Sequence, residues 1–81
     1  MPKKSVHQEE HAVLVRLLKE VRLASGVTQV GLAEALGRSQ SHISDIENGT
    51  RRLDLIQLRE YCLACGVSLV SFVKRFESEV T

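Results

Sequence analysis

Residues 28–49 read TQVGLAEALGRSQSHISDIENG, and this stretch decides the fold. It contains two short runs in which apolar residues recur at helical spacing, and the segment Gly37-Arg38-Ser39 separates them. Thr28 and Ser39 are residue types that cap the start of a helix, whereas Gly37 and the pair Asn48-Gly49 are signals for the end of one. The pattern therefore predicts two helices of about two turns each, joined by a tight turn.

The two predicted helices divide their residues between an inner and an outer side. The apolar residues expected to hold the helices at a steep angle are Leu32, Leu36, Ile43 and Ile46. Ala33 must be small because the second helix crosses close to it, and Gly37 provides the backbone freedom that the turn requires. The free side of the second helix carries polar side chains of short to medium length, namely Gln40, Ser41, Ser44 and Asp45. Side chains of this kind suit contacts with base edges in the major groove of DNA.

Outward from this pair, helical spacing predicts three more helices. They run from about Gln8 to Ser25, from about Asp54 to Cys65, and from a cap at Ser68 to about Glu77. The residues expected to face inward on them are Leu14, Leu17, Leu18, Val21, Leu55, Leu58, Cys62, Cys65, Leu69 and Phe72. No segment alternates as a strand would. We therefore expect an all-α fold of five helices, in one domain over residues 8–78, with a flexible arm over residues 1–7.

Length and composition agree with a small helical domain. The chain has 81 residues, of which 43% are hydrophobic and only 4% aromatic, and an aliphatic core of this kind suits packed helices. No apolar run approaches the roughly 20 residues of a membrane helix, and no apolar stretch follows the N-terminal lysines as in a signal peptide. We therefore expect a cytoplasmic protein with no membrane partner. The net charge of +1 does not by itself indicate a nucleic-acid partner.

The stretch 28–49, with Arg22 before it and CGVSL (residues 65–69) after it, resembles the phage-repressor and Cro-like, or XRE, family of helix-turn-helix DNA-binding domains. The resemblance covers about Leu14 to Val73. It implies the five-helix lambda-repressor-like fold. It also implies that the chain binds a specific double-stranded DNA sequence and regulates transcription.

The resemblance also implies roles for individual residues. Gln40 matches a base-reading glutamine, and the other expected base contacts are Ser41, Ser44 and Asp45. Asp45 would accept from cytosine N4 or pair with a nearby basic residue. Gln29 would meet a phosphate and buttress Gln40. The full set of expected phosphate-binding residues is Gln29, Arg38, Ser39, His42, Asn48, Thr50, Arg51 and Arg52. For His42, contact with a base edge and simple solvation are alternatives.

Arg22 and Glu47 match an internal ion pair of the family, which would tie the first predicted helix to the end of the third. We interpret this pair as structural. Removing one partner of a buried ion pair leaves the other charge without compensation. The pair should therefore matter for folding before it matters for recognition.

Several apolar residues are surplus to the inward stripes of the last two predicted helices: Ile56, Leu63, Val70, Val73 and Phe76. Neighbouring exposed apolar residues indicate a patch that another surface covers. We expect a two-fold homodimer through these residues, which would bind an operator with inverted repeats. The alternative is that some of them widen the core of a small domain.

Cys62 and Cys65 form a C-x-x-C pattern, which also occurs in zinc and redox sites. A zinc site would need two more ligands, such as His7 and His11, and would make the protein a metal-dependent sensor. Both cysteines lie at inward helical positions, so we expect them to pack in the core. We expect no cofactor, no metal site and no small-molecule ligand, and without a catalytic constellation we do not expect an enzyme.

Two other functions remain open at this point. The chain could be an autoregulating antitoxin or a restriction-modification controller, because these proteins share the same pattern. It could instead be a helical protein-interaction adaptor whose DNA-binding face is vestigial. The polar third helix, framed by Arg38, Arg51 and Arg52, argues against the adaptor.

Overall fold

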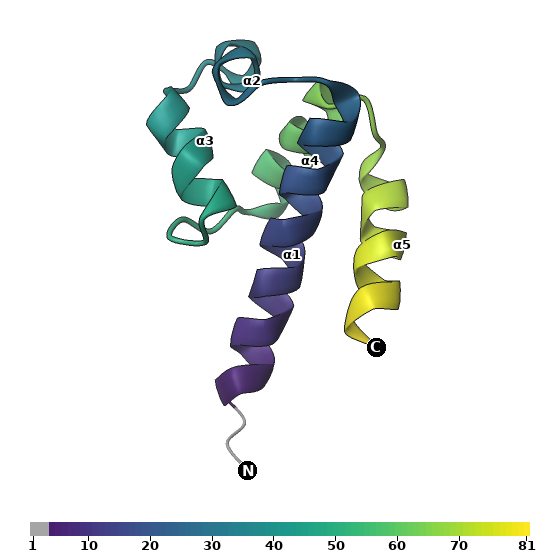
Figure 1. Ribbon diagram of the computed structural model, residues 1–81. Helices are drawn as coiled ribbons and strands as arrows, with labels where there is room; N and C mark the ends of the chain where they lie inside the picture. The colour runs from purple at the N-terminus through teal and green to yellow at the C-terminus, as the bar shows by residue number, and fades with distance from the viewer. Residues whose placement is uncertain (1–3) are drawn as a thin grey trace.

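The structure is a computed structural model that describes residues 4–81, with side chains from Glu9 onward. It contains five helices, and no strand occurs in these residues (Figure 1). The helices are α1 (Lys4–Ser25), α2 (Gln29–Leu36), α3 (Gln40–Glu47), α4 (Leu55–Ala64) and α5 (Leu69–Val80). The predicted all-α, five-helix fold is confirmed.

Side-chain caps explain why the last four helices begin where they do. The hydroxyl oxygens of Thr28, Ser39 and Ser68 each accept a hydrogen bond from the backbone N–H three residues later. Asp54 caps α4 in the same way at 2.7 Å from the N–H of Gln57, whose side chain accepts from the N–H of Asp54 at 3.1 Å. These contacts satisfy N–H groups that have no partner inside a helix, and so they fix each helix start.

Helices α1 and α5 are both longer than the sequence predicts. Helix α1 begins at Lys4 rather than near Gln8, so residues 4–7 of the predicted arm are helical, and residues 1–3 lie outside the described residues. Helix α5 continues to Val80 rather than ending near Glu77. Neither extension contains Pro or Gly, the residues that most disfavour a helix. The packed part of each helix is already formed, so adding residues at its end requires no new nucleation.

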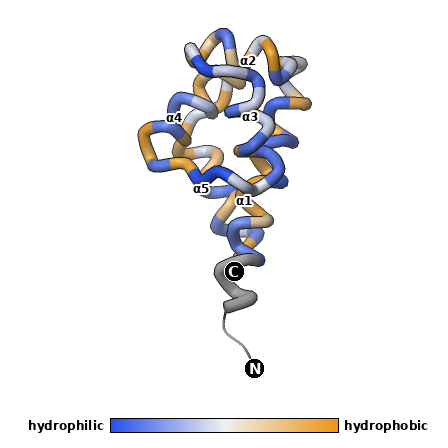
Figure 2. The backbone as a smooth tube through the Cα atoms, turned by 90° about the vertical axis from the view of Figure 1, so that its left-hand side faces the viewer, coloured by the Kyte–Doolittle hydropathy of each residue, from blue (hydrophilic) through white to orange (hydrophobic). Residues whose placement is uncertain are grey.

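The main contacts between helices form a closed ring. Helix α1 packs against α3 and α5, α2 packs against α3 and α4, and α4 packs against α5. All five helices contribute to one core cluster, which consists of Leu17, Leu18, Val21, Leu32, Ala33, Ile43, Ile46, Tyr61, Cys62, Cys65 and Phe72. Figure 2 shows hydrophobic and hydrophilic segments alternating along the helices. This alternation places an apolar stripe of each helix on the shared core.

Two predicted placements are wrong. Leu55 is 66% exposed rather than inward, because it is the first residue of α4 and the core-facing side of that helix begins only with Leu58. Phe76 is not surplus on the surface, since it is partly buried and packs against the core. A small domain with few large side chains uses this aromatic ring to widen its own core.

Both cysteines are buried free thiols in the core, as predicted. Burial and the neighbouring Cys65 raise the pKa of the Cys62 thiol to about 11, so it stays protonated at neutral pH. No group of three or more His, Cys, Asp or Glu side chains among the described residues is placed to hold a metal ion. The side chain of His7 lies outside the described residues.

No single helix in residues 4–81 has the length and hydropathy needed to cross a membrane. Helices α4 and α5 meet these criteria only when taken together. They are bent by 108° relative to each other at the break between them.

Candidate nucleic-acid interface

The turn between α2 and α3 sets the geometry of the candidate site. Gly37 has a φ of +66°, a left-handed conformation that side chains other than glycine rarely adopt. Its N–H and that of Arg38 donate to the last free carbonyls of α2, which closes that helix before the chain turns. Ala33 is buried and belongs to the same core cluster as Leu32 of α2 and Ile43 of α3. The outer side of α3 is thereby left uncovered.

A buried ion pair ties α1 to the end of α3. The Arg22 guanidinium donates to both carboxylate oxygens of Glu47, at 2.6 Å from Nε and 3.0 Å from Nη2. Arg22 Nη1 also donates to the carbonyl of Val27 at 2.9 Å. Both side chains are less than one-tenth exposed. Arg22 therefore links α1 both to the end of α3, through Glu47, and to the start of α2, through Val27, which lies just before that helix.

Tyr61 completes this pair from α4. Its hydroxyl donates to Glu47 Oε2 at 2.5 Å, and it lies 3.4 Å from the carbonyl oxygen of Leu18. The sequence predictions missed this residue. The available signal was that the only tyrosine of the chain lies on the inward side of a predicted helix, where its hydroxyl needs a polar partner.

The charge on Glu47 depends on these partners. Burial acts against the carboxylate, but hydrogen bonds from Arg22, Tyr61 and Gln29 outweigh it, so the pKa of Glu47 lies below its usual value of 4.5. Burial and the adjacent Glu47 carboxylate raise the pKa of Tyr61. At neutral pH the site therefore holds a carboxylate, a guanidinium and a neutral phenol, each with its hydrogen bonds made.

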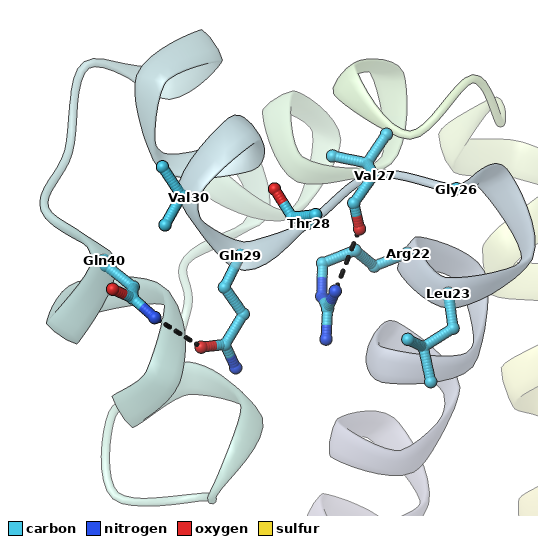
Figure 3. Close-up of a pocket in the computed structure, with 8 residues that line it drawn as sticks. All are labelled: Arg22, Leu23, Gly26, Val27, Thr28, Gln29, Val30 and Gln40. Atoms are coloured by element: carbon cyan, nitrogen blue, oxygen red, sulfur yellow. Dashed lines mark hydrogen bonds between the residues drawn. The ribbon is translucent and has the colours of Figure 1, made fainter.

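The Glu47 carboxylate also orients glutamine side chains at the surface. Gln29 Nε2 donates to Glu47 Oε1 at 3.1 Å, and Gln40 Nε2 lies 3.4 Å from Gln29 Oε1 (Figure 3). A continuous chain thus leads from buried Arg22 through Glu47 and Gln29 to exposed Gln40. Gln29 and Gln40 also line an open groove of about 420 Å³ whose rim includes Leu23 and Val30. If Gln29 buttresses Gln40, as the sequence predicts, it does so through this contact.

The polar residues on the outer side of α3 are Gln40, Ser41, Ser44 and Asp45. We call them the reading face, after the base contacts that the sequence predicts for them. The side chains of Gln40 and Ser41 are exposed, whereas Ser44 and Asp45 are half-buried. Ser41 Oγ lies 3.1 Å from the Ser39 hydroxyl that caps the helix. No described basic side chain forms an ion pair with Asp45, so its carboxylate remains available on this face.

Residues 48–52 follow α3, and we call them the phosphate clamp, after the phosphate contacts that the sequence predicts for this segment. Gly49 turns the chain with a φ of +88°. Asn48 Oδ1 accepts from the N–H of Thr50 at 3.1 Å and from its hydroxyl at 2.8 Å. The backbone N–H groups of Thr50 and Arg51 return to the carbonyl of Asp45 at 3.0 and 3.2 Å. These bonds fold the segment back onto α3 and leave the side chains of Arg51 and Arg52 exposed.

The electrostatics around α3 are basic. Partial burial and the positive charges of Arg51 and Arg38 lower the pKa of His42, against a smaller opposite effect of Asp45. Both arginines are therefore close enough to His42 to act on its charge electrostatically. The structure brings Gln29 into contact with Gln40, and it places Arg38 and Arg51 near His42 of α3.

The residues expected at a dimer interface lie on α4 and α5, outside the α2–α3 pair. Ile56, Leu63, Val70 and Val73 are exposed, from 38% for Val73 to 69% for Ile56. Leu55, which was expected in the core, adds a further exposed apolar side chain to this group. Phe76 leaves it, since it packs against the core.

A family model described as a helix-turn-helix domain matches residues 13–74. Among solved structures, an XRE-family-like protein from Pseudomonas syringae pv. tomato is 37% identical in sequence and has a TM-score of 0.89. That match covers 96% of this chain and 95% of the other. Among curated proteins, no significant match was found.

Two further structures share the fold. The restriction-modification controller C.Esp1396I, solved as a tetramer with its natural 35-base-pair operator, is 28% identical with a TM-score of 0.78, covering 88% of this chain and 93% of the other. The clp gene regulator ClgR from C. glutamicum is 26% identical with a TM-score of 0.77, covering 89% and 92%. The chain therefore belongs to the XRE-type family of helix-turn-helix DNA-binding domains.

Proposed function

We infer that the protein is a transcriptional regulator that binds a specific double-stranded DNA sequence. The observation that carries this inference is the hydrogen-bonded chain from Arg22 to Gln40. This chain links the side-chain amide of Gln40, which we propose reads a base, to the buried Arg22–Glu47 ion pair. The amide is therefore positioned before any DNA is bound. Such preorganisation lowers the side-chain entropy lost on binding.

The proposed division of labour follows from the geometry. Gln29, Arg38, Ser39 and His42 with the phosphate clamp would contact the DNA backbone, which sets the register of α3 in the major groove. The reading face would then discriminate bases, with the Gln40 amide pairing to adenine N6 and N7. Asp45 accepts a hydrogen bond from cytosine N4 in this proposal, because its carboxylate has no cationic partner among the described residues.

We further propose that two copies associate through Ile56, Leu63, Val70 and Val73. This apolar group lies on helices that take no part in the reading face, so both copies could present α3 to one duplex. A two-fold dimer favours an operator of inverted repeats about one helical turn apart. In this proposal the protein acts in the cytoplasm by binding, without catalysis, cofactor or small-molecule ligand.

A role as a restriction-modification controller is the second candidate. The similarity to C.Esp1396I, a controller solved on its own operator, favours it over an antitoxin or an adaptor. The adaptor is the least favoured candidate, because the chain keeps Gln29, Gln40 and the exposed arginines in one arrangement. Genes adjacent to the coding sequence distinguish the candidates, since a controller would lie beside a restriction endonuclease and a methyltransferase.

Selection of bound sequences from a random duplex pool at moderate salt tests the proposed function. We expect an enriched inverted repeat with half-sites about one turn apart. An enriched single half-site would retain the reading face and remove the dimer. If the folded protein enriches no sequence, the proposed function is wrong.

A further inference from the structure

A second groove, whose lining combines polar and apolar side chains, adjoins the phosphate clamp on the side of α1. It has a volume of about 480 Å³ and is lined by His11, Ala12, Val15, Arg16, Asn48, Gly49 and Arg52. One wall is α1 and the other is the loop after α3, which lies beside α1 in Figure 1. The groove shares Asn48, Gly49 and Arg52 with the clamp. The groove therefore connects the clamp with α1, a helix for which neither the sequence nor the proposed function predicts a contact with DNA.

His11 and Arg52 both line this groove, His11 from α1 and Arg52 from the loop after α3. Partial burial and the positive charge of Arg52 lower the pKa of His11. A Cβ atom built on Gly49 would lie 4.0 Å from His11 Cε1, so the imidazole reaches the loop directly. At neutral pH the imidazole is therefore kept neutral beside a guanidinium.

The other charged groups near His11 do not compensate that guanidinium within the groove. Arg16 lines it too, but its own guanidinium donates to Glu20 and Glu79. Glu9 and Glu10 line a separate groove with Val13, Glu79 and Val80. Asn48 Oδ1 is occupied by Thr50, and its amide nitrogen donates to no other described residue. The groove thus presents donors and cationic groups, with no carboxylate among its lining residues.

We propose that this groove binds one additional phosphate of the DNA backbone, between His11 and Arg52, and that the protein thereby binds DNA more tightly as pH falls. The inference rests on the proposed function. A phosphate at this point would favour the imidazolium, so that binding takes up a proton. Affinity then rises by up to about tenfold per pH unit, in the range between the pKa of His11 in the free protein and in the complex.

The test compares dissociation constants from about pH 6 to pH 8 for the unaltered chain and for His11→Gln. The probes are a duplex that carries the selected site and a random-sequence duplex of equal length. We expect His11→Gln to lose part of the pH dependence on both duplexes, because a phosphate contact is not specific for sequence. The slope of log affinity against log salt should become shallower by about 0.9 at low pH only.

Matched variants separate His11 from the other two histidines. His42→Gln and His7→Gln should both retain the part of the pH dependence that His11→Gln removes. His11→Lys, which carries a permanent charge, should bind at pH 8 as the unaltered chain binds at pH 6. Thermal unfolding of each variant verifies that the fold is unchanged.

Two results would overturn the inference. One is an unchanged pH dependence and salt slope in folded His11→Gln, which would leave the proposed function intact. The other is the absence of DNA binding by the unaltered chain at any pH, which would overturn the proposed function as well.

Discussion

At the scale of single residues, base reading and phosphate binding make opposite predictions for Gln40 and Arg51. Gln40→Ala removes the amide that we propose pairs with adenine, so we expect a loss of about 1–3 kcal/mol on the selected site and little change on random DNA. Arg51→Ala is the matched control, since loss of a phosphate contact weakens both duplexes about equally. Competition binding at fixed salt measures both. Equal losses for Gln40→Ala on the two duplexes would remove Gln40 from base reading.

Tyr61 supports the same site from inside the core. Tyr61→Phe keeps the ring but removes the hydroxyl that donates to Glu47. Because the acceptor is charged, we expect a loss of about 1.5–3 kcal/mol in the free energy of unfolding. Urea denaturation at neutral pH measures this loss. Full stability in Tyr61→Phe would mean that Arg22 and Gln29 alone satisfy the carboxylate.

For single residues, the sequence predicts where a side chain lies on its helix better than it predicts which other side chain it contacts. The ion pair of Arg22 and Glu47 could be predicted because the resemblance supplied both members. For Tyr61, the sequence indicates only that a buried hydroxyl needs a polar partner. That the partner is Glu47 depends on how α4 docks, and only the fold determines that. Asp45, which has no cationic partner among the described residues, illustrates the same limit, because spacing alone does not show which charges meet.

At the scale of helices, α5 combines a buried aromatic anchor with surface ion pairs. Phe72 is buried in the core, whereas Arg75 pairs with Glu20 of α1 through side chains that are more than a third exposed. We expect Phe72→Ala to cost about 3–5 kcal/mol and Arg75→Ala less than about 1 kcal/mol. Chemical denaturation at one fixed protein concentration compares them. A larger loss for Arg75→Ala would show that the ion pairs, rather than the core, dock α5.

Helix starts could be predicted and the outer helix ends could not. Thr28, Ser39, Asp54 and Ser68 each carry a side-chain oxygen that caps the next helix, so the signal is local. The start of α1 and the end of α5 have no such signal, and they depend on whether packing sustains the helix. Leu55 shows a related limit: helical spacing places it on the inward side, but its side chain is exposed, and Leu58 is the residue of this turn that packs against the core.

At the scale of the whole molecule, the charge on Glu47 makes stability depend on pH. Its pKa is lowered in the folded state, so its contribution is present above the unfolded value near 4.5 and is lost as pH falls through the folded value. Glu47→Gln should be less stable at neutral pH and should lose less stability on acidification. Melting temperatures across this range measure the difference. Glu34→Gln, at an exposed position on α2, is the control and should follow the unaltered chain.

The assembly is the remaining property of the whole molecule, and Val70 tests it. Val70 is 65% exposed in the first turn of α5, where an added negative charge is compatible with the helix dipole. Val70→Asp should therefore keep its helical content while the apolar contact between two copies is lost. Ser71→Asp adds the same charge to the same turn, outside the apolar group, and should leave assembly intact. Sedimentation should show a dimer for the unaltered chain and Ser71→Asp, and a monomer for Val70→Asp. If the unaltered chain is a monomer at concentrations that saturate the operator, the apolar group serves another contact and each α3 binds its half-site alone.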